Sequence, residues 1–255
     1  MGKVAIITGV ANGIGRVLTE NFLSHDYEVA IIDKDGISLQ MMKEKYPHLL
    51  TFQGDISEKS ILDDFLKVIK NAFSSVHVLI NNACYSNLGL KSCSYEAFNE
   101  VLRVGISAPF YLTQQLMPLF DEGASIINLS STRAFMSQAN TESYSAAKGG
   151  ITALTHAMSI TLAGKVRVNA IAPGWIDCSP YQHEEDQPTE LSELDHIQQP
   201  VGRVGTPQDI AELALFLASD QAGFIDGQTI SIDGGMSKQM IYHNDESWIY
   251  KGREE

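Results

Sequence analysis

The stretch KVAIITGVANGIGRVLTENFL, residues 3–23, decides the fold of this 255-residue chain. Residues 4–7 are apolar without alternation, which is typical of a strand covered on both faces. A turn with glycines at 9, 13 and 15 follows, and a helical pattern then runs to about residue 23. Such a unit directs free backbone N–H groups and the positive end of the helix dipole at a pyrophosphate. Because the spacing is Gly-xxx-Gly-x-Gly and not GxGxxG, a glycine-rich turn without a ligand is the competing interpretation.

The same alternation of strand and helix continues along the chain. Helical patterns such as 60–72 and 144–162 separate further apolar runs, at residues 29–32, 50–52, 76–80, 125–129, 167–171 and 229–232. This order predicts an α/β fold with an open, mostly parallel, doubly wound sheet of Rossmann type, flanked by helices. No Gly/Ser-rich or Pro-rich linker interrupts it, so we expect a single domain over residues 1–255.

Composition restricts the partners and the compartment. The chain has 31 acidic and 18 basic residues, a net charge of −13, which argues against nucleic acid or an anionic membrane as the main partner. No apolar run reaches the roughly 18 residues of a membrane span. Three cysteines without zinc-type spacing, and a first strand without an apolar leader, favour a reducing cytoplasm. His183 and His196, 13 residues apart, make a poor ligand set, so we expect no metal site.

Asp33 ends the second predicted strand, 18 residues after Gly15. A carboxylate at this point can accept hydrogen bonds from the ribose hydroxyls of an adenosine, and it repels a 2′-phosphate. Lys34 and Arg16 lie nearby in the sequence and could partly offset that repulsion. An Asp that merely begins a turn is the competing interpretation. We predict that NAD is preferred over NADP.

Tyr144 and Lys148 stand four residues apart at the start of a helical pattern, which places both on one face. A phenol is a weak base at neutral pH, but an adjacent ammonium favours the phenolate, which can take a proton from an alcohol. Ser131 follows the predicted strand at 125–129, at the edge where ligands bind, and its hydroxyl could orient the reacting oxygen. A surface pair and a serine that simply ends the strand are the competing interpretations. No GxSxG elbow supports a hydrolase nucleophile.

Taken together, the motifs resemble the short-chain dehydrogenase/reductase family in its compact single-domain form, from residue 3 to about residue 236. The resemblance rests on their order along the chain: TGxxxGxG at 8–15, Asp55-Ile56, Asn81-Asn82-Ala83, Ser131, YxxxK at 144–148, NAIAPG at 169–174 and DGG at 233–235. Each motif is weak alone, and the ordered set is specific. It implies a homo-oligomer, a tetramer or a dimer, that acts on a small molecule.

The resemblance also implies roles for single residues. Tyr144 would be the general acid/base, Lys148 would bind the nicotinamide ribose and tune Tyr144, and Ser131 would orient the substrate oxygen. The cofactor, NAD, would contact Tyr144 and Lys148 and would also lie against a second set of residues. This set comprises the turn (Gly9, Asn12, Gly13, Ile14, Gly15), Asp33 at the ribose, Asp55 and Ile56 at the adenine, Asn82 and Ala83 at the riboses, and Pro173, Gly174 and Ile176 at the carboxamide.

Three positions depart from the family pattern. Gly105 replaces an Asn that normally kinks a helix and holds a water in the proton relay, so a dinucleotide-binding member with little turnover is the alternative function. We expect the local structure to be settled around the glycine. Cys84 replaces a glycine at a close approach, and Cys178 replaces a Thr that contacts the carboxamide. In the enoyl reductases of this fold, the corresponding motif is similar to Tyr-x6-Lys. Tyr144 and Lys148 are only four residues apart, so this chain does not match that branch.

Two segments concern the substrate. Residues 177–199, the expected lid, hold seven carboxylates and no Lys or Arg, so we predict a small neutral alcohol or ketone, such as a polyol or sugar, and not a polyanion. The tail at 236–255 has no assigned role. Arg133 could contact a substrate carboxylate, but a structural pair with Glu142 is the preferred interpretation.

Overall fold

A computed structural model describes residues 2–85, 89–182, 190–242 and 245. Within these residues the strands form a seven-stranded sheet in the order β3-β2-β1-β4-β5-β6-β7, and neighbouring strands pair in parallel. This confirms the predicted fold class. The strands are β1 (Lys3–Thr8), β2 (Tyr27–Asp33), β3 (Leu50–Gln53), β4 (Val76–Asn81), β5 (Phe120–Leu129), β6 (Val166–Pro173) and β7 (Thr229–Ile232).

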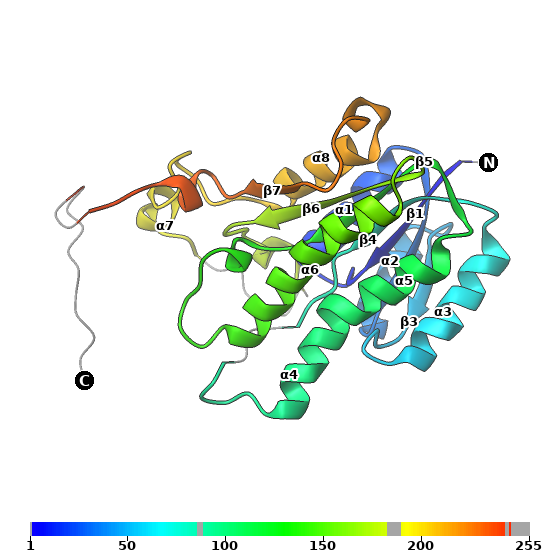
Figure 1. Ribbon diagram of the computed structural model, residues 1–255, viewed down its shortest axis with the longest axis horizontal. Coiled ribbons are helices and arrows are strands. Elements are labelled where there is room, and N and C mark those ends of the chain that lie inside the picture. The colour runs from blue at the N-terminus through cyan, green and yellow to red at the C-terminus, as the bar shows by residue number, and fades with distance from the viewer. Residues whose placement is uncertain (1, 86–88, 183–189, 243–244, 246–255) are drawn as a thin grey trace.

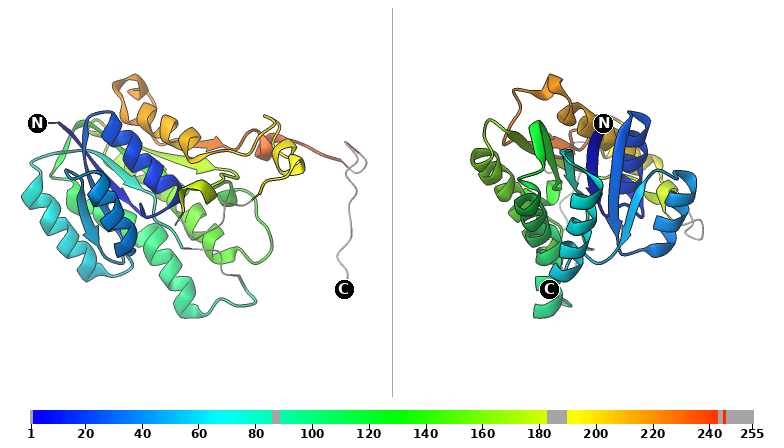
Figure 2. Two further views of the ribbon diagram at one scale, coloured as in Figure 1. Left: turned by 180° about the vertical axis from the view of Figure 1, so that it is seen from behind. Right: turned by 90° about the vertical axis from the view of Figure 1, so that its right-hand side faces the viewer.

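Helices cover both faces of the sheet. Figure 1 shows α3 (Lys59–Ala72), α5 (Ala108–Leu116) and α6 (Glu142–Thr161) in front of it. The view from behind in Figure 2 shows α1 (Gly13–Ser24), α2 (Gly36–Lys45) and α8 (Pro207–Ala218) on the other face. Two shorter helices, α4 (Tyr95–Leu102) and α7 (Glu193–Ile197), lie on the connections. Among the helices that the structure describes, none is both long and apolar enough to cross a membrane.

The double covering explains why the strands lack alternation. In β1, Ala5 and Ile7 pack with Phe22 of α1 in one core, while Ile6 packs with Phe65 of α3 in the other. All five side chains are fully buried. Each strand therefore needs apolar residues at successive positions, because both of its faces contact a helix layer.

The parallel register brings the motif residues to one edge. β1 lies between β2 and β4, so the chain reverses its direction of winding there, and the carboxyl ends of these strands flank a crevice. Asn81 pairs in register with Asn128, and Leu129 with Ile171. The segments that follow β1, β2, β4, β5 and β6, far apart in sequence, consequently meet above this edge.

Candidate active site

The glycine turn after β1 packs against the segment after β4. Gly9 adopts a left-handed conformation with φ of +71°, and a Cβ on it would lie 2.5 Å from the Cα of Ala83. A Cβ on Gly15 would lie 2.0 Å from the carbonyl oxygen of Gly9. Asn82 fixes the same contact, because its Nδ2 donates to the carbonyls of Thr8 and Gly9 at 3.1 and 2.6 Å. The glycines are thus required by close backbone approach as well as by the turn.

The first turn of α1 supplies donors of the kind that a phosphate needs. Asn12 precedes the helix with extended backbone, and its side chain does not cap the first N–H groups. No acidic residue stands in that first turn. The Cys178 sulfur lies against Gly13, 3.0 Å from where a Cβ on Gly13 would be. Burial raises the pKa of the Cys178 thiol, so the thiol adds no negative charge at neutral pH and the helix end fits an anion.

Asp33 is fixed across the glycine turn. Its Oδ2 accepts from the Ala11 backbone N–H at 2.8 Å, and its Oδ1 accepts from the Asp35 N–H at 3.0 Å. These two bonds hold the carboxylate beside the turn, at the carboxyl end of β2. A carboxylate oxygen has a second lone pair, so both oxygens can still accept from ribose hydroxyls.

Asp55 already has a strong partner that sequence analysis missed. The Tyr85 hydroxyl donates to Asp55 Oδ2 at 2.5 Å, and Asp55 Oδ1 accepts from the Ser57 N–H at 2.8 Å. Burial raises the pKa of Asp55, but these hydrogen bonds outweigh it and hold the pKa below its ordinary value. The Lys34 ammonium lies 4.4 Å from the centroid of the Tyr85 ring. No pattern in the sequence joins three residues that follow three different strands.

These elements enclose a cleft of about 470 Å³. The structure places ten of the predicted cofactor residues on its wall: Gly9, Asn12, Gly13, Ile14, Gly15, Asp33, Asp55, Ile56, Asn82 and Ala83. Lys34, Tyr85, Cys84 and Cys178 line the same cleft. The remaining predicted residues, Tyr144, Lys148, Pro173, Gly174 and Ile176, lie farther along the carboxyl edge and outside its lining.

The predicted catalytic residues meet at the end of β5. Lys148 is 4% exposed, and its Nζ donates to the carbonyl of Leu129 at 2.6 Å. The Ser130 hydroxyl donates to the main-chain carbonyl of Lys148 at 3.0 Å. Both the side chain and the main chain of Lys148 are therefore hydrogen-bonded to residues at the end of β5. The ammonium lies 5.4 Å from the centroid of the Tyr144 ring. Ser131 follows directly, is nearly buried, and accepts the Arg133 N–H at 3.1 Å.

Gly105 lies where two helices touch. Residues Arg103–Ser107 form a π-helical turn between α4 and α5. This turn packs against α6, and a Cβ on Gly105 would lie 2.8 Å from the Cβ of Ala147. That distance is too short for two carbon atoms, and Ala147 has no rotatable side chain with which to give way. The turn is therefore fitted to glycine.

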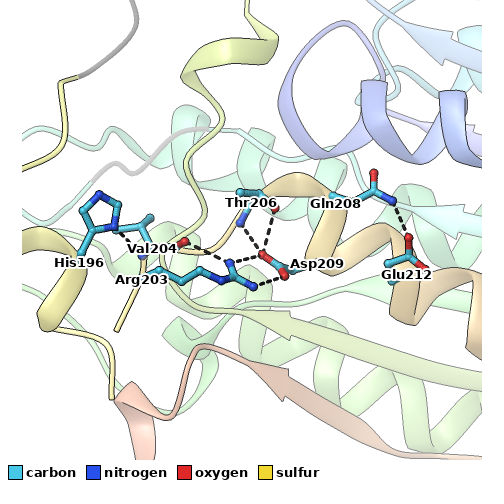
Figure 3. Close-up of polar contacts among 7 residues, drawn as sticks. All are labelled: His196, Arg203, Val204, Thr206, Gln208, Asp209 and Glu212. Atoms are coloured by element: carbon cyan, nitrogen blue, oxygen red, sulfur yellow. Dashed lines mark hydrogen bonds and ion pairs between the residues drawn. The ribbon is translucent and has the colours of Figure 1, made fainter. Parts of the chain in front are cut away.

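The segment that returns from residues 177–199 is anchored to α8 (Figure 3). The Arg203 guanidinium contacts both carboxylate oxygens of Asp209, at 2.7 and 2.6 Å. Asp209 Oδ2 also accepts from the N–H and hydroxyl of Thr206, so it caps the helix. Gly205, which lies between Arg203 and Thr206 in the sequence, forms an isolated parallel β-bridge with Ile176. The Gly205 N–H donates to the Trp175 carbonyl at 3.1 Å, and the Asp177 N–H donates to the Gly205 carbonyl at 2.8 Å. These main-chain bonds hold the backbone on both sides of Ile176, the residue predicted at the carboxamide.

Other expectations on the substrate side have mixed outcomes. The predicted pair of Arg133 and Glu142 is wrong: Arg133 Nη2 donates to Gln138 at 2.6 Å, and Glu142 accepts the Leu90 N–H at 3.1 Å. Arg133 and Glu142 are each hydrogen-bonded to another residue instead of to each other. Residues 183–189 of the expected lid, with His183 and three of its seven carboxylates, lie outside the described residues, as does most of the tail at 236–255.

Comparison with known proteins yields matches over nearly the whole chain. The family model described as "Enoyl-(Acyl carrier protein) reductase" matches residues 9–237. An "Uncharacterized oxidoreductase" of Thermotoga maritima is 36% identical, with 94% of this chain and 98% of that protein covered. The 3-oxoacyl-[acyl-carrier-protein] reductase FabG of the same organism is 31% identical, with 92% and 98% covered.

Solved structures agree. An apo SCOR enzyme from Clostridium thermocellum has a TM-score of 0.89 and 40% identity, over 99% of this chain and 100% of that one. The "Short-chain dehydrogenase/reductase SDR:Glucose/ribitol dehydrogenase" from Brucella melitensis has a TM-score of 0.82 and 26% identity, over 92% and 96%.

Proposed function

Because the chain belongs to the short-chain dehydrogenase/reductase family of oxidoreductases, we propose that it interconverts a secondary alcohol and a ketone with NAD(H) as the cofactor. The observation that carries this proposal is the buried Lys148, tied to the end of β5 and placed beside the Tyr144 ring. An ammonium in low dielectric, next to a phenol four residues earlier on the same helix, favours proton transfer at the tyrosine oxygen. A bound nicotinamide would supply the hydride or accept it.

In this proposal each residue has a separate task. The Tyr144 hydroxyl gives a proton to the ketone oxygen and, in the reverse direction, takes one from the alcohol. Lys148 donates one hydrogen bond to Leu129, and an ammonium has three donors, so the other two serve the ribose and the phenol oxygen. Ser131, whose oxygen accepts the Arg133 N–H, directs its own proton at the substrate oxygen.

The dinucleotide would lie in the cleft between the glycine turn and Asp55. The uncapped first turn of α1 fits the pyrophosphate, and the fixed carboxylate of Asp33 fits the adenosine ribose. Asp33 favours NAD over NADP because a 2′-phosphate beside it would meet a second negative charge. Asp33→Ala should weaken NADH binding and relieve the repulsion of NADPH, measured by titration of cofactor fluorescence. Asp64→Ala on α3, away from the cleft, is the control, and a wild-type preference for NADPH would refute the assignment.

The proposed substrate is small and neutral, because the segment 177–199 carries only negative formal charge. Asp177 and Asp195 accept hydrogen bonds from serines and not from cations, and the nearby Arg203 is paired with Asp209. A negative field at the entrance disfavours polyanions. The test compares kcat/KM for a CoA thioester and its uncharged analogue at low and high salt. A preference for the CoA substrate at low salt would contradict the proposal.

An alternative is a dinucleotide-binding sensor with little turnover, and Gly105 favours it. Glycine at this position has no side-chain amide to hold a water near the lysine. Oxidation of NADH with a panel of neutral ketones separates the two functions. Turnover with any ketone that is abolished by Tyr144→Phe supports the enzyme, and saturable NADH binding without turnover on the whole panel supports the sensor.

We further propose a cytoplasmic homo-oligomer, a tetramer or a dimer. On α6, Ile151 and Met158 are buried in the core, whereas Ile160 on the same helix is 78% exposed. Phe224, before β7, is fully exposed. Large apolar side chains at the surface fit an interface between copies. Light scattering coupled to gel filtration measures the mass, and a monomer would contradict this expectation.

A further inference from the structure

Lys34 is the cation of the dinucleotide cleft. Among the described residues that line it, Lys34 is the one basic side chain, next to the carboxylates of Asp33, Asp35 and Asp55. Arg16, the other basic residue near the glycine turn in sequence, pairs with Glu20 at 3.8 Å. Arg16 and Lys45 line a smaller hollow beside the cleft, where both pair with Glu20. Within the cleft lining itself, the positive charge beside Asp33 is that of Lys34.

The position of this cation is set by Tyr85. The Lys34 ammonium lies 4.4 Å from the centroid of the Tyr85 ring, within the range of a cation–π contact. The ring is held in turn, because its hydroxyl donates to Asp55 at 2.5 Å, and Asp55 is held by the Ser57 N–H. Lys34, Tyr85 and Asp55 follow β2, β4 and β3, so the contact spans the adenosine end of the cleft.

We propose that Tyr85 is a specificity-determining residue of the dinucleotide site: it holds the Lys34 ammonium over its ring, toward Asp55, and so keeps this cation from neutralising Asp33. The inference rests on the proposed use of the cleft for NAD(H). Without the ring, the flexible four-carbon stem of Lys34 lets the ammonium approach the ribose. There it offsets the repulsion between Asp33 and a 2′-phosphate.

The expected size of the effect is modest. A cation–π contact at an exposed site changes an equilibrium by about two- to five-fold. Removing the Tyr85 ring should therefore reduce the ratio of the Kd for NADPH to the Kd for NADH by about that factor. Tyr85→Phe keeps the ring but removes the bond to Asp55 that holds it, so it should lower this ratio less than Tyr85→Leu does.

The test is a double-mutant cycle on the unliganded protein, with NADH and NADPH as fluorescent probes. The variants are Tyr85→Leu, Lys34→Ala and the double variant, with Tyr85→Phe as the ring-retaining control. Lys59→Ala is the charge control, because Lys59 also lies over a tyrosine ring, that of Tyr111 at 4.7 Å, but outside the cleft lining. Circular dichroism and thermal melting verify that each variant is folded.

The expected result is a lower ratio in Tyr85→Leu and no such change when Lys34 is already alanine. A ratio that is unchanged in folded Tyr85→Leu, or a gain that persists without Lys34, would overturn the inference. The wild-type ratio tests the cofactor assignment separately. A wild-type protein that prefers NADPH contradicts the proposed NAD preference, while the cycle still measures whether Tyr85 acts through Lys34.

Discussion

The two ends of the carboxyl edge are built differently. At the end proposed for the adenosine, beside β1–β3, the wall is largely main chain: a turn with left-handed glycines, the start of α1, and carboxylates that accept backbone N–H groups. At the end proposed for the substrate, beside β5–β7, large apolar side chains lie open to solvent. Phe135 is 59% exposed, Met136 42% and Trp175 36%.

This difference teaches where specificity resides. A wall made of backbone has nearly the same shape in any chain with the same glycine spacing, so it suits a ligand shared by many enzymes. A wall made of side chains from separate loops takes its shape from each of them. The adenosine end therefore indicates the cofactor class, and the substrate end decides the reaction partner.

The largest expected effect separates chemistry from binding. Tyr144→Phe removes the hydroxyl alone and should lower kcat by about 10²- to 10⁴-fold, as loss of a general acid/base does. The Kd for NADH should stay within about two-fold, because Tyr144 lies outside the cleft lining. Single-turnover kinetics and fluorescence titration measure the two quantities. A variant that retains more than a tenth of the activity would contradict the role of Tyr144.

A second change disrupts the main-chain wall of the cleft. In Gly15→Ala the new Cβ would lie 2.0 Å from the carbonyl oxygen of Gly9, so the turn must open. Overpacking of this kind costs about 1–3 kcal/mol of stability, and NADH affinity should fall at least ten-fold with it. The matched control is Gly149→Ala in α6, which meets no atom within 4 Å and should stabilise the helix by about 0.5–1 kcal/mol. Equal NADH affinity in both variants would show that the close approach is unimportant.

A third change concerns the boundary between the two ends. Gly105→Asn restores the usual family residue, but its Cβ would meet the Cβ of Ala147 at 2.8 Å. We expect kcat to fall about ten-fold and stability by about 1–2 kcal/mol. Adding Ala147→Gly should recover activity because it removes the opposing atom. A rise in kcat for the single variant would show instead that the missing amide limits the proton relay.

The smallest effect is electrostatic. The Arg203 guanidinium holds the pKa of Asp209 well below its ordinary value, so the ionised carboxylate stabilises the fold above about pH 4, and this stabilisation is lost as the pH falls further. Asp209→Asn should cost about 1 kcal/mol or less at pH 7, since the Arg203 side chain is half exposed. The gap in unfolding free energy between wild type and variant should narrow below about pH 4. A gap that widens there would contradict the sign.

Particular elements show how far sequence reasoning reached. The seven strands and the glycine turn before α1 were predicted from apolar periodicity and glycine spacing, and the joint site of Ser131, Tyr144 and Lys148 was implied by the family resemblance. β5 begins at Phe120, earlier than the predicted start at residue 125. The prediction missed these first residues because they include the exposed Asp121 and Glu122 and show no apolar pattern. The pairing of Arg133 was wrong because a guanidinium on a loop can reach several acceptors, and the chain order does not rank them.

The sequence by itself determined the layers of the fold and the class of cofactor cradle, because apolar periodicity and glycine spacing act locally and each residue carries its own signal. Tertiary structure alone decided that Tyr85 contacts both Asp55 and Lys34, that Gly105 is matched to Ala147, and that Gly205 pairs with the backbone at Ile176. These contacts join residues from separate strands and helices. Their distances depend on how the layers pack, which no local pattern along the chain records.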